Sequence, residues 1–211
     1  MIFVIDISLM EMKVFTKIIS LFGYVVALLA TITSIISVSL FNTKEWIFSE
    51  KGIIENAQWI LIVCAMFVYL IAAFNDSLKS KRMIYFFLVS LCYLFLVREV
   101  DFEKLNLPSY IEMFLYGKGR AITVSIAMSI PIICATMKFN HYKKESVNFL
   151  FSKEGVILFS GGVLLGLGSL FEHQSAIFIG PTGSELLEEL SELWGYAVIL
   201  FAATTSAKTP R

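Results

Sequence analysis

The stretch that decides the fold is LLEELSELWGYAVILFAATT, residues 186–205. Only Leu193–Ala203 is free of charge within it, whereas about 20 mostly apolar residues are needed to cross the hydrocarbon core of a bilayer. A helix that crosses a membrane here must therefore carry Glu188, Glu189 and Glu192 into the membrane zone. An ionisable group at that depth costs about 2.5 to 3.5 kcal/mol on insertion scales, so such groups are usually functional or paired. The sequence therefore locates a polar site in an apolar helix.

The whole chain has the composition of an integral membrane protein. Of its 211 residues, 57% are hydrophobic and 16% are charged, which is far from the usual balance of a soluble domain. The links between the apolar runs are too short for a separate soluble domain. We therefore predict an all-α, polytopic transmembrane bundle of six helices, which forms a single integral membrane domain over residues 1–211. The predicted helices cover approximately residues 14–41, 53–74, 83–102, 119–137, 156–175 and 186–205.

The distribution of Lys and Arg predicts the orientation of this bundle. With the N-terminus inside, 11 of the 17 Lys and Arg residues fall on the inner face and 6 on the outer face. Cytoplasmic loops carry an excess of these residues, so both termini are predicted to be cytoplasmic. The expected location is the bacterial inner (plasma) membrane, with several passes through it. The lipid bilayer is the expected partner, and no nucleic acid is expected to bind.

Polar residues gather at the helix ends that this topology places outside. In the last helix, Glu185, Glu188, Glu189, Glu192 and Tyr196 fall within an arc of about 100° and form one stripe facing the bundle. Acids in a first turn also suit the helix dipole, which explains Glu185 and Glu188 but not Glu192. The candidate binding residues are Glu55, Arg98, Glu99, Asp101, Glu172, His173, Glu188, Glu189, Glu192 and Tyr196.

Arg98 is the expected counter-ion of these carboxylates. It lies near the outer end of the third helix, and its planar guanidinium group can hold a carboxylate with two hydrogen bonds. We expect it to pair with a carboxylate from the last helix or the second helix. The alternative is that Arg98 only extends to the membrane interface. Glu55, in the first turn of the second helix, fits either the site or the helix dipole.

The fifth predicted helix combines a packing face with polar residues at its outer end. Its small residues allow a neighbouring helix to approach closely, and they are Gly161, Gly162, Gly166 and Gly168. Glu172 and His173 follow. A lone His is usually a structural hydrogen-bonding group, but its acidic neighbours keep a ligand role open. Residues 107–116 predict a short interfacial helix, which could lie over the site as a lid.

Two similar stretches suggest an internal repeat. Trp46–Ile54 and Phe149–Ile157 are 103 residues apart, and this offset aligns the first three helices with the last three. Three-helix copies would be inverted, as in many secondary transporters. Against this interpretation, the similarity does not extend further, and the charges crowd one face rather than the midplane. The 3+3 inverted repeat stays an open alternative.

Residue types exclude several cofactors. No haem with two axial histidines is expected, because His141 and His173 are predicted on opposite sides of the membrane. A di-iron carboxylate bundle needs Glu-x-x-His, whereas Glu172 and His173 are adjacent. The three cysteines lie singly in different spans and predict neither a disulfide nor a metal motif.

Two segments, Glu55–Gln58 and Arg98–Phe102, resemble segments of small uncharacterised bacterial polytopic inner-membrane proteins. This resemblance implies a membrane bundle and no particular activity. The outline of a small bundle with a polar cap also resembles the alkaline ceramidase-like membrane hydrolases, whose zinc is held by histidines. The chain lacks those histidines, so this second resemblance stops at shape.

Three classes of function remain. Acids outnumber cations in the outward-facing site, which favours a protein that binds or transports a cation, a proton or an amine. One alternative is an accessory or assembly subunit with a purely structural charge network, whose partners are other membrane subunits. A further alternative is a membrane-embedded hydrolase of lipid-linked substrates, with a Glu and His173 as acid and base. The cofactor that such sites could hold is a divalent cation.

Overall fold

The computed structural model describes residues 21, 25, 27–36, 53–75, 81–100, 108, 113–174 and 181–207, and every regular element in them is a helix. The helices are α2 (Ile53–Asn75), α3 (Arg82–Glu99), α5 (Gly117–Met137), α6 (Phe139–Leu150), α7 (Lys153–Gln174) and α9 (Pro181–Ala207), preceded by the apolar helical segment Ala27–Ile36. The all-α class is therefore confirmed for this part of the chain. Helix α9 begins at Pro181 rather than at residue 186, because a proline suits the first turn of a helix, where its missing N–H needs no partner.

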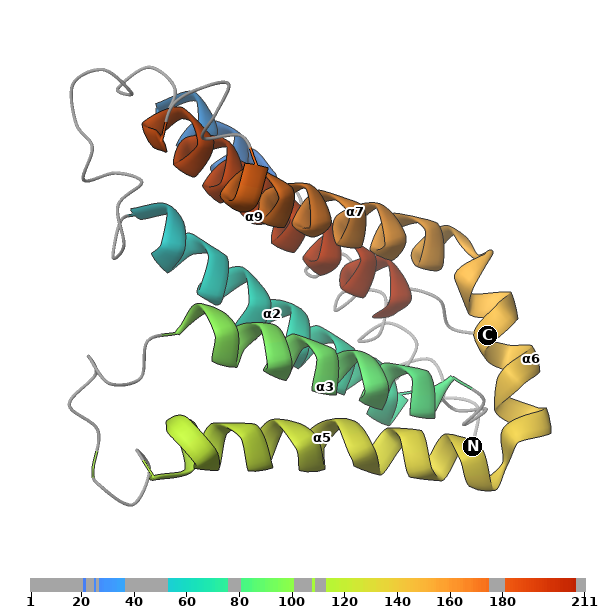
Figure 1. The fold of residues 1–211 in the computed structure, drawn as a ribbon. Coiled ribbons are helices and arrows are strands. Elements are labelled where there is room, and N and C mark those ends of the chain that lie inside the picture. The colour runs from blue at the N-terminus through green and yellow to red at the C-terminus, as the bar shows by residue number, and fades with distance from the viewer. Residues whose placement is uncertain are drawn as a thin grey trace.

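Helix α9 is the central helix of the bundle. It packs against both α7 and α2, while α2 packs on α3 and α3 packs on α5. Figure 1 shows α2, α5 and α9 running in one direction and α3 and α7 in the other. The largest fully buried apolar and aromatic side chains lie mainly on α2 and α9. They include Ile54, Ile62, Tyr69, Leu193, Tyr196 and Leu200. The core therefore lies between α2 and α9.

Glycines set the close packing of α7 on α9. A Cβ atom added at Gly195 of α9 would lie 2.8 Å from Cγ of Leu165 on α7. A Cβ atom added at Gly161 of α7 would lie 3.0 Å from the carbonyl oxygen of Gly195. The two helices therefore approach each other where one or both lack a side chain.

Only half of the predicted glycine face of α7 contacts α9. Gly161 and Gly168 face α9, in agreement with the prediction. A Cβ atom added at Gly162 or Gly166 would meet no atom within 4 Å, so these two glycines lie outside the α7–α9 contact. The difference follows from the helical period, since Gly162 and Gly166 lie on a different side of α7 from Gly161 and Gly168.

Helix α6 is an element that the sequence did not predict. It crosses the end of the bundle between α5 and α7, where a loop was expected (Figure 1). Its corner with α7 is held by Ser152, whose Oγ donates to the carbonyl of Phe149 (2.7 Å) and accepts from the N–H of Gly155 (3.2 Å). A Cβ atom at Gly155 would lie 2.0 Å from that carbonyl oxygen. With 12 residues and several polar side chains, α6 is too short and too polar to be found as a span.

Three helices are long and apolar enough to cross a membrane, namely Ile54–Asn75, Gly117–Met137 and Lys153–Phe171. On α5, Pro131 is the buried residue, and outward-facing side chains include Ile122, Ile126, Ile130 and Ile133. An apolar surface of this extent marks a contact with lipid or protein. By length and composition, these three helices are those expected of a membrane protein. Charged residues within α3 and α9 set these two helices apart from the three candidate spans.

Several predictions lie partly or wholly outside the described residues. Of the first span, 14–41, the structure describes Leu21, Val25 and Ala27–Ile36. The first copy of the repeat lies almost wholly outside. Of the interfacial segment 107–116, Pro108 and residues 113–116 are described, and 113–115 form a helical turn. Gly117 follows with φ of 51°, a left-handed backbone that favours glycine.

Candidate carboxylate site

The polar ends of three helices meet at one end of the bundle. Because α3 runs opposite to α2 and α9, its last turn lies beside their N-terminal halves (Figure 1). The residues brought together there are Gln58, Arg98, Glu99, Glu189, Glu192 and Tyr196. We call these six residues the carboxylate cluster.

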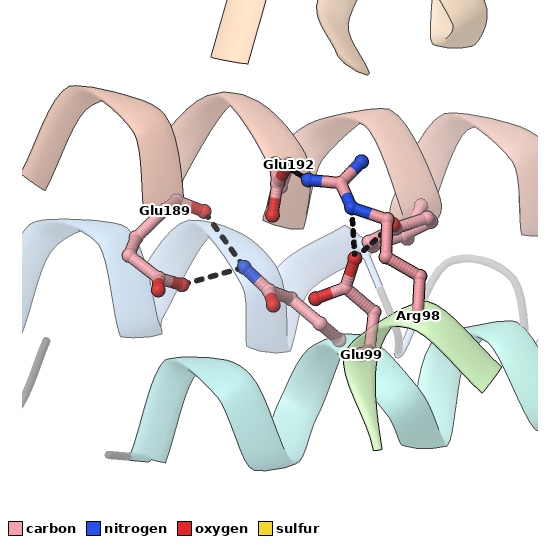
Figure 2. Close-up of polar contacts among 6 residues, drawn as sticks. Arg98, Glu99, Glu189 and Glu192 are labelled. Atoms are coloured by element: carbon pink, nitrogen blue, oxygen red, sulfur yellow. Dashed lines mark hydrogen bonds and ion pairs between the residues drawn. The ribbon is translucent and has the colours of Figure 1, made fainter. Parts of the chain in front are cut away.

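Arg98 is the central cation of the carboxylate cluster. Its Nη2 donates a hydrogen bond to Oε1 of Glu192, and its Nε lies 3.6 Å from Oε1 of Glu99. Figure 2 shows Glu192 projecting from α9 toward the guanidinium group, with Arg98 and Glu99 reaching up from the end of α3. The expected pairing of Arg98 with a carboxylate from the last helix is confirmed. The Arg98 side chain remains 41% exposed, so the cluster is open to the surface at Arg98.

Tyr196 of α9 holds the Glu99 carboxylate through a hydrogen bond. Its hydroxyl donates a hydrogen bond of 2.6 Å to Oε1 of Glu99, the same oxygen that faces Arg98. The ring packs edge-on against Phe95, with 5.8 Å between centroids, and the residue is 1% exposed. A carboxylate oxygen that accepts a hydrogen bond and also faces a cation is held in one position, because both contacts would be lost together if the carboxylate turned.

Within the described part of the chain, the Glu189 side chain is bound by a neutral amide and by no cation. Nε2 of Gln58 donates to Oε2 of Glu189 at 2.7 Å and to its main-chain carbonyl at 3.1 Å. Figure 2 shows Glu189 on the α9 turn before Glu192, away from the Arg98 guanidinium. Gln58 is 1% exposed, and its Oε1 has no hydrogen-bond partner among the described residues. The cluster therefore contains a buried acceptor that is not satisfied by the groups around it.

Gly168 of α7 makes room for Glu192. A Cβ atom there would lie 3.0 Å from Cγ of Glu192 and 3.6 Å from Cβ of Ser191. The side chain of Glu192 is thus covered by the α7 backbone and is only 5% exposed. A larger residue at position 168 would push Glu192 away from Arg98.

Two further predicted acids lie near the cluster. Glu55 of α2 interacts electrostatically with Glu99, and Glu188 of α9 interacts with both Glu189 and Glu192.

The remaining predicted site residues are not placed by the structure. Asp101 lies outside the described residues. Glu172 and His173 belong to the last turn of α7, but their side chains also lie outside what is described. Glu185, which the helical wheel put in the same stripe as Glu192, is exposed to solvent. The stripe begins to face its neighbours only one turn later, at Glu188.

Gln58 is the cluster residue that the candidate list omitted. A neutral amide is less conspicuous than a charge, although a Gln in an apolar run, one turn after Glu55, is itself unusual. An amide buried between helices needs hydrogen-bond partners as a charge does. The need of a buried amide for hydrogen-bond partners could therefore have identified Gln58 as a site residue from the sequence.

The charges of the carboxylate cluster do not balance. Glu99, Glu189 and Glu192 provide three carboxylates, and Arg98 provides one guanidinium group. Arg98 is already shared between Glu99 and Glu192, which leaves Glu189 with the amide of Gln58. Among the described residues, partly buried Glu189 has a neutral amide rather than a cation as its hydrogen-bond partner, and a proton or another cation would stabilise it there.

The arrangement does not favour a metal ion. Among the described residues, no group of three or more His, Cys, Asp or Glu side chains is arranged to hold one. Cys64, Cys92 and Cys134 are free thiols on separate helices. Arg98 also occupies the position between two carboxylates that a divalent ion would need.

Comparison of the chain with protein-family models, with curated proteins and with solved structures finds no match. The assignment of a function therefore depends on the geometry of the carboxylate cluster.

Proposed function

We propose that this chain is a multi-pass membrane protein that binds a small cation, either a proton or an amine, at Glu189 and Gln58. The observation that carries the proposal is Oε1 of Gln58, which is buried without a hydrogen-bond partner in the described part of the chain. It lies beside Glu189, a carboxylate to which no guanidinium of that part is bound. Binding to this site is the proposed activity. Transport of the bound cation through the bundle would be a further activity that builds on this binding.

The chemistry of the two residues selects the kind of ligand. The Glu189 carboxylate and the Gln58 carbonyl oxygen are both acceptors, so the ligand must supply N–H or O–H donors. A primary ammonium group has three donors and a full charge, and it could satisfy both oxygens at once. A proton would neutralise Glu189 and turn it into a donor. A divalent metal is a poorer fit, because it prefers several hard oxygen ligands.

The membrane topology proposed for this site has six spans with both termini in the cytoplasm of a bacterium. Helices α3 and α9 are included in spite of their charges, because Arg98 of α3 pairs with Glu192 of α9 and with its neighbour Glu99. Paired ionisable groups are the kind that membrane helices tolerate. In this topology the carboxylate cluster faces outward, and α6 lies on the cytoplasmic side.

Thermal denaturation of the purified protein in a neutral detergent tests the proposal. Methylammonium chloride should raise the melting temperature in a saturable way relative to sodium chloride at equal ionic strength, because a ligand that binds only the folded state stabilises it by mass action. Glu189→Gln should abolish the response. Glu185→Gln, an exposed acid one turn away, is the matched control and should keep it.

A proton bound at Glu189 would give a different result. Methylammonium would then have no effect, and infrared spectroscopy at neutral pH would show a protonated-carboxyl band that Glu189→Gln removes. The proposal fails if neither the saturable shift nor the band is found.

The second candidate function is that of an accessory subunit with a structural charge network. It is favoured by the mutual satisfaction of Arg98, Glu99, Glu192 and Tyr196, which need no ligand. Absence of both responses above, with normal folding of the variants, would favour this candidate. The lipid-linked hydrolase is not proposed, because it requires His173, whose side chain is not among those described.

A further inference from the structure

Helix α6 and its flanks form a basic surface at the end of the bundle opposite to the carboxylate cluster. Lys143 and Lys144 lie on α6, Lys138 and Lys153 flank it, and all four are exposed. Glu145 is the acidic residue of the helix. This end of the molecule therefore presents a concentration of positive charge.

The same helix also exposes large apolar side chains. Phe139 is 59% exposed, Leu150 is 55% exposed and Phe151, directly after the helix, is 84% exposed. On a helix of 100° per residue, Phe139, Val147 and Leu150 fall within an arc of about 80°. Exposed apolar residues beside lysines are typical of a helix that lies in the plane of a membrane interface.

The rotation of α6 about its axis is fixed by Phe149. That residue is 3% exposed, and its ring packs edge-on against Tyr85 of α3, with 6.4 Å between centroids. The Nζ atom of Lys81 lies 5.9 Å from the centroid of the same ring. With Phe149 held in the bundle, Phe139 and Leu150 lie about 80° and 100° around the helix from it, and both remain more than half exposed.

We propose that α6 binds the headgroups of anionic phospholipids, with its apolar side chains entering the acyl boundary of the same leaflet. Lys143 has the geometry for this role, since its Nζ lies 5.9 Å from the centroid of the Phe139 ring. A lysine that covers an aromatic ring leaves its charge at headgroup level while its stem stays in apolar contact. Anionic headgroups attract each basic residue near the membrane surface.

A lipid leaflet fits this surface better than a protein partner does. The exposed apolar residues continue from α6 onto the outward faces of the two candidate spans that it joins, through Met137 (80% exposed) and Val156 (57% exposed). A membrane that surrounds α5 and α7 would therefore reach α6 without interruption. This inference does not depend on the carboxylate cluster at the other end.

Lipid binding by the purified full-length chain tests the proposal. Retention of phosphatidylglycerol and of phosphatidylcholine is compared by native mass spectrometry for the parent protein, for Lys143→Gln with Lys144→Gln, and for Lys118→Gln with Arg120→Gln. The last pair is the matched control, because it removes the same charge from exposed positions at the opposite end of α5. Loss of two lysines should weaken the phosphatidylglycerol preference by about 25-fold, at about fivefold for each.

The outcomes separate clearly. The parent and the control pair should prefer phosphatidylglycerol, and the α6 pair should lose that preference. An equal loss in both pairs, or no preference in the parent, would overturn the proposal. A melting-temperature shift with soluble glycerol phosphate as large as that with phosphatidylglycerol would also overturn it, since the site would then bind a free anion rather than a leaflet.

Discussion

Arg98 is the residue on which the carboxylate cluster depends most, because it neutralises two carboxylates from different helices. Its partner Glu192 is covered by α9 and α7 and cannot reach water, whereas Arg98 itself is partly exposed. Removing Arg98 would leave Glu192 and Glu99 facing each other without a cation. The loss of this one residue would therefore leave both carboxylates without their counter-ion.

We predict that the effects of Arg98→Met and Glu192→Gln on stability are coupled. Removing one partner of a fully buried pair costs about 3 to 5 kcal/mol, and the exposure of Arg98 should place its loss below that range. The double variant should be more stable than Arg98→Met alone, because Glu192, the more deeply buried of the two carboxylates, would no longer be left as an unpaired charge. The free energy of unfolding in a detergent titration measures this. Simple additivity would show that the two residues are independent.

A second prediction at this scale concerns the Tyr196 hydroxyl. Tyr196→Phe leaves Glu99 without a buried donor and should cost about 1 to 3 kcal/mol of unfolding free energy. Tyr93→Phe is the control, since the Tyr93 hydroxyl bonds Thr123 (3.0 Å) in a less buried place and should cost about 0.5 to 1.5 kcal/mol. Equal losses in the two variants would mean that Glu99 does not need Tyr196.

The helices position the cluster through backbone contact. Helix α9 carries acids on the side that faces α2 and α3, and small residues of α7 cover it from another side. Apolar attraction is weak between helices in lipid, so close backbone packing does most to hold such pairs together. The glycine contact of α7 and α9 is therefore the element that keeps Glu192 in place.

We predict opposite effects for two glycine substitutions. Gly195→Ala should destabilise the protein by about 1 to 3 kcal/mol, because the added methyl group overlaps Leu165 in a packed interface. Gly162→Ala meets no neighbouring atom and should be neutral or stabilising by up to about 1 kcal/mol, from helix propensity. Melting temperatures compare the two. A harmful Gly162→Ala would show that another surface packs on that side of α7.

The molecule as a whole has two chemically different ends. The carboxylate cluster lies where α2 and α9 begin, and α6 with its lysines lies at the other end (Figure 1). Lysines and arginines are retained on the cytoplasmic side of membrane proteins. The two ends should therefore lie on opposite sides of the membrane.

Cysteine accessibility in intact cells tests this polarity. In a variant without the native cysteines, Glu185→Cys should react with a membrane-impermeant thiol reagent, and Lys144→Cys should react only after the cells are opened. Both positions are exposed, so burial does not protect either of them. The reverse pattern would contradict the proposed orientation, and reaction at both positions in intact cells would contradict a membrane-crossing bundle.

The sequence alone determined the class of the protein and the end at which its polar residues gather. Apolar runs and charges are properties of the chain itself, and their spacing along a helix fixes which side chains share a face. For this reason the helical fold and the Arg98 pairing could be predicted, the latter because a guanidinium near the end of an apolar helix pairs with an acid from a neighbouring helix.

Only the tertiary structure decided which groups satisfy one another. Glu189 is bound by Gln58 across 131 positions of sequence, and Gly168 rather than Gly166 makes room for Glu192. Helix α6 likewise owes its position to Phe149, which packs on a distant helix. These outcomes depend on how α2, α3, α7 and α9 rotate against one another. That rotation is set by the packing of whole helices, which no local pattern in the chain records.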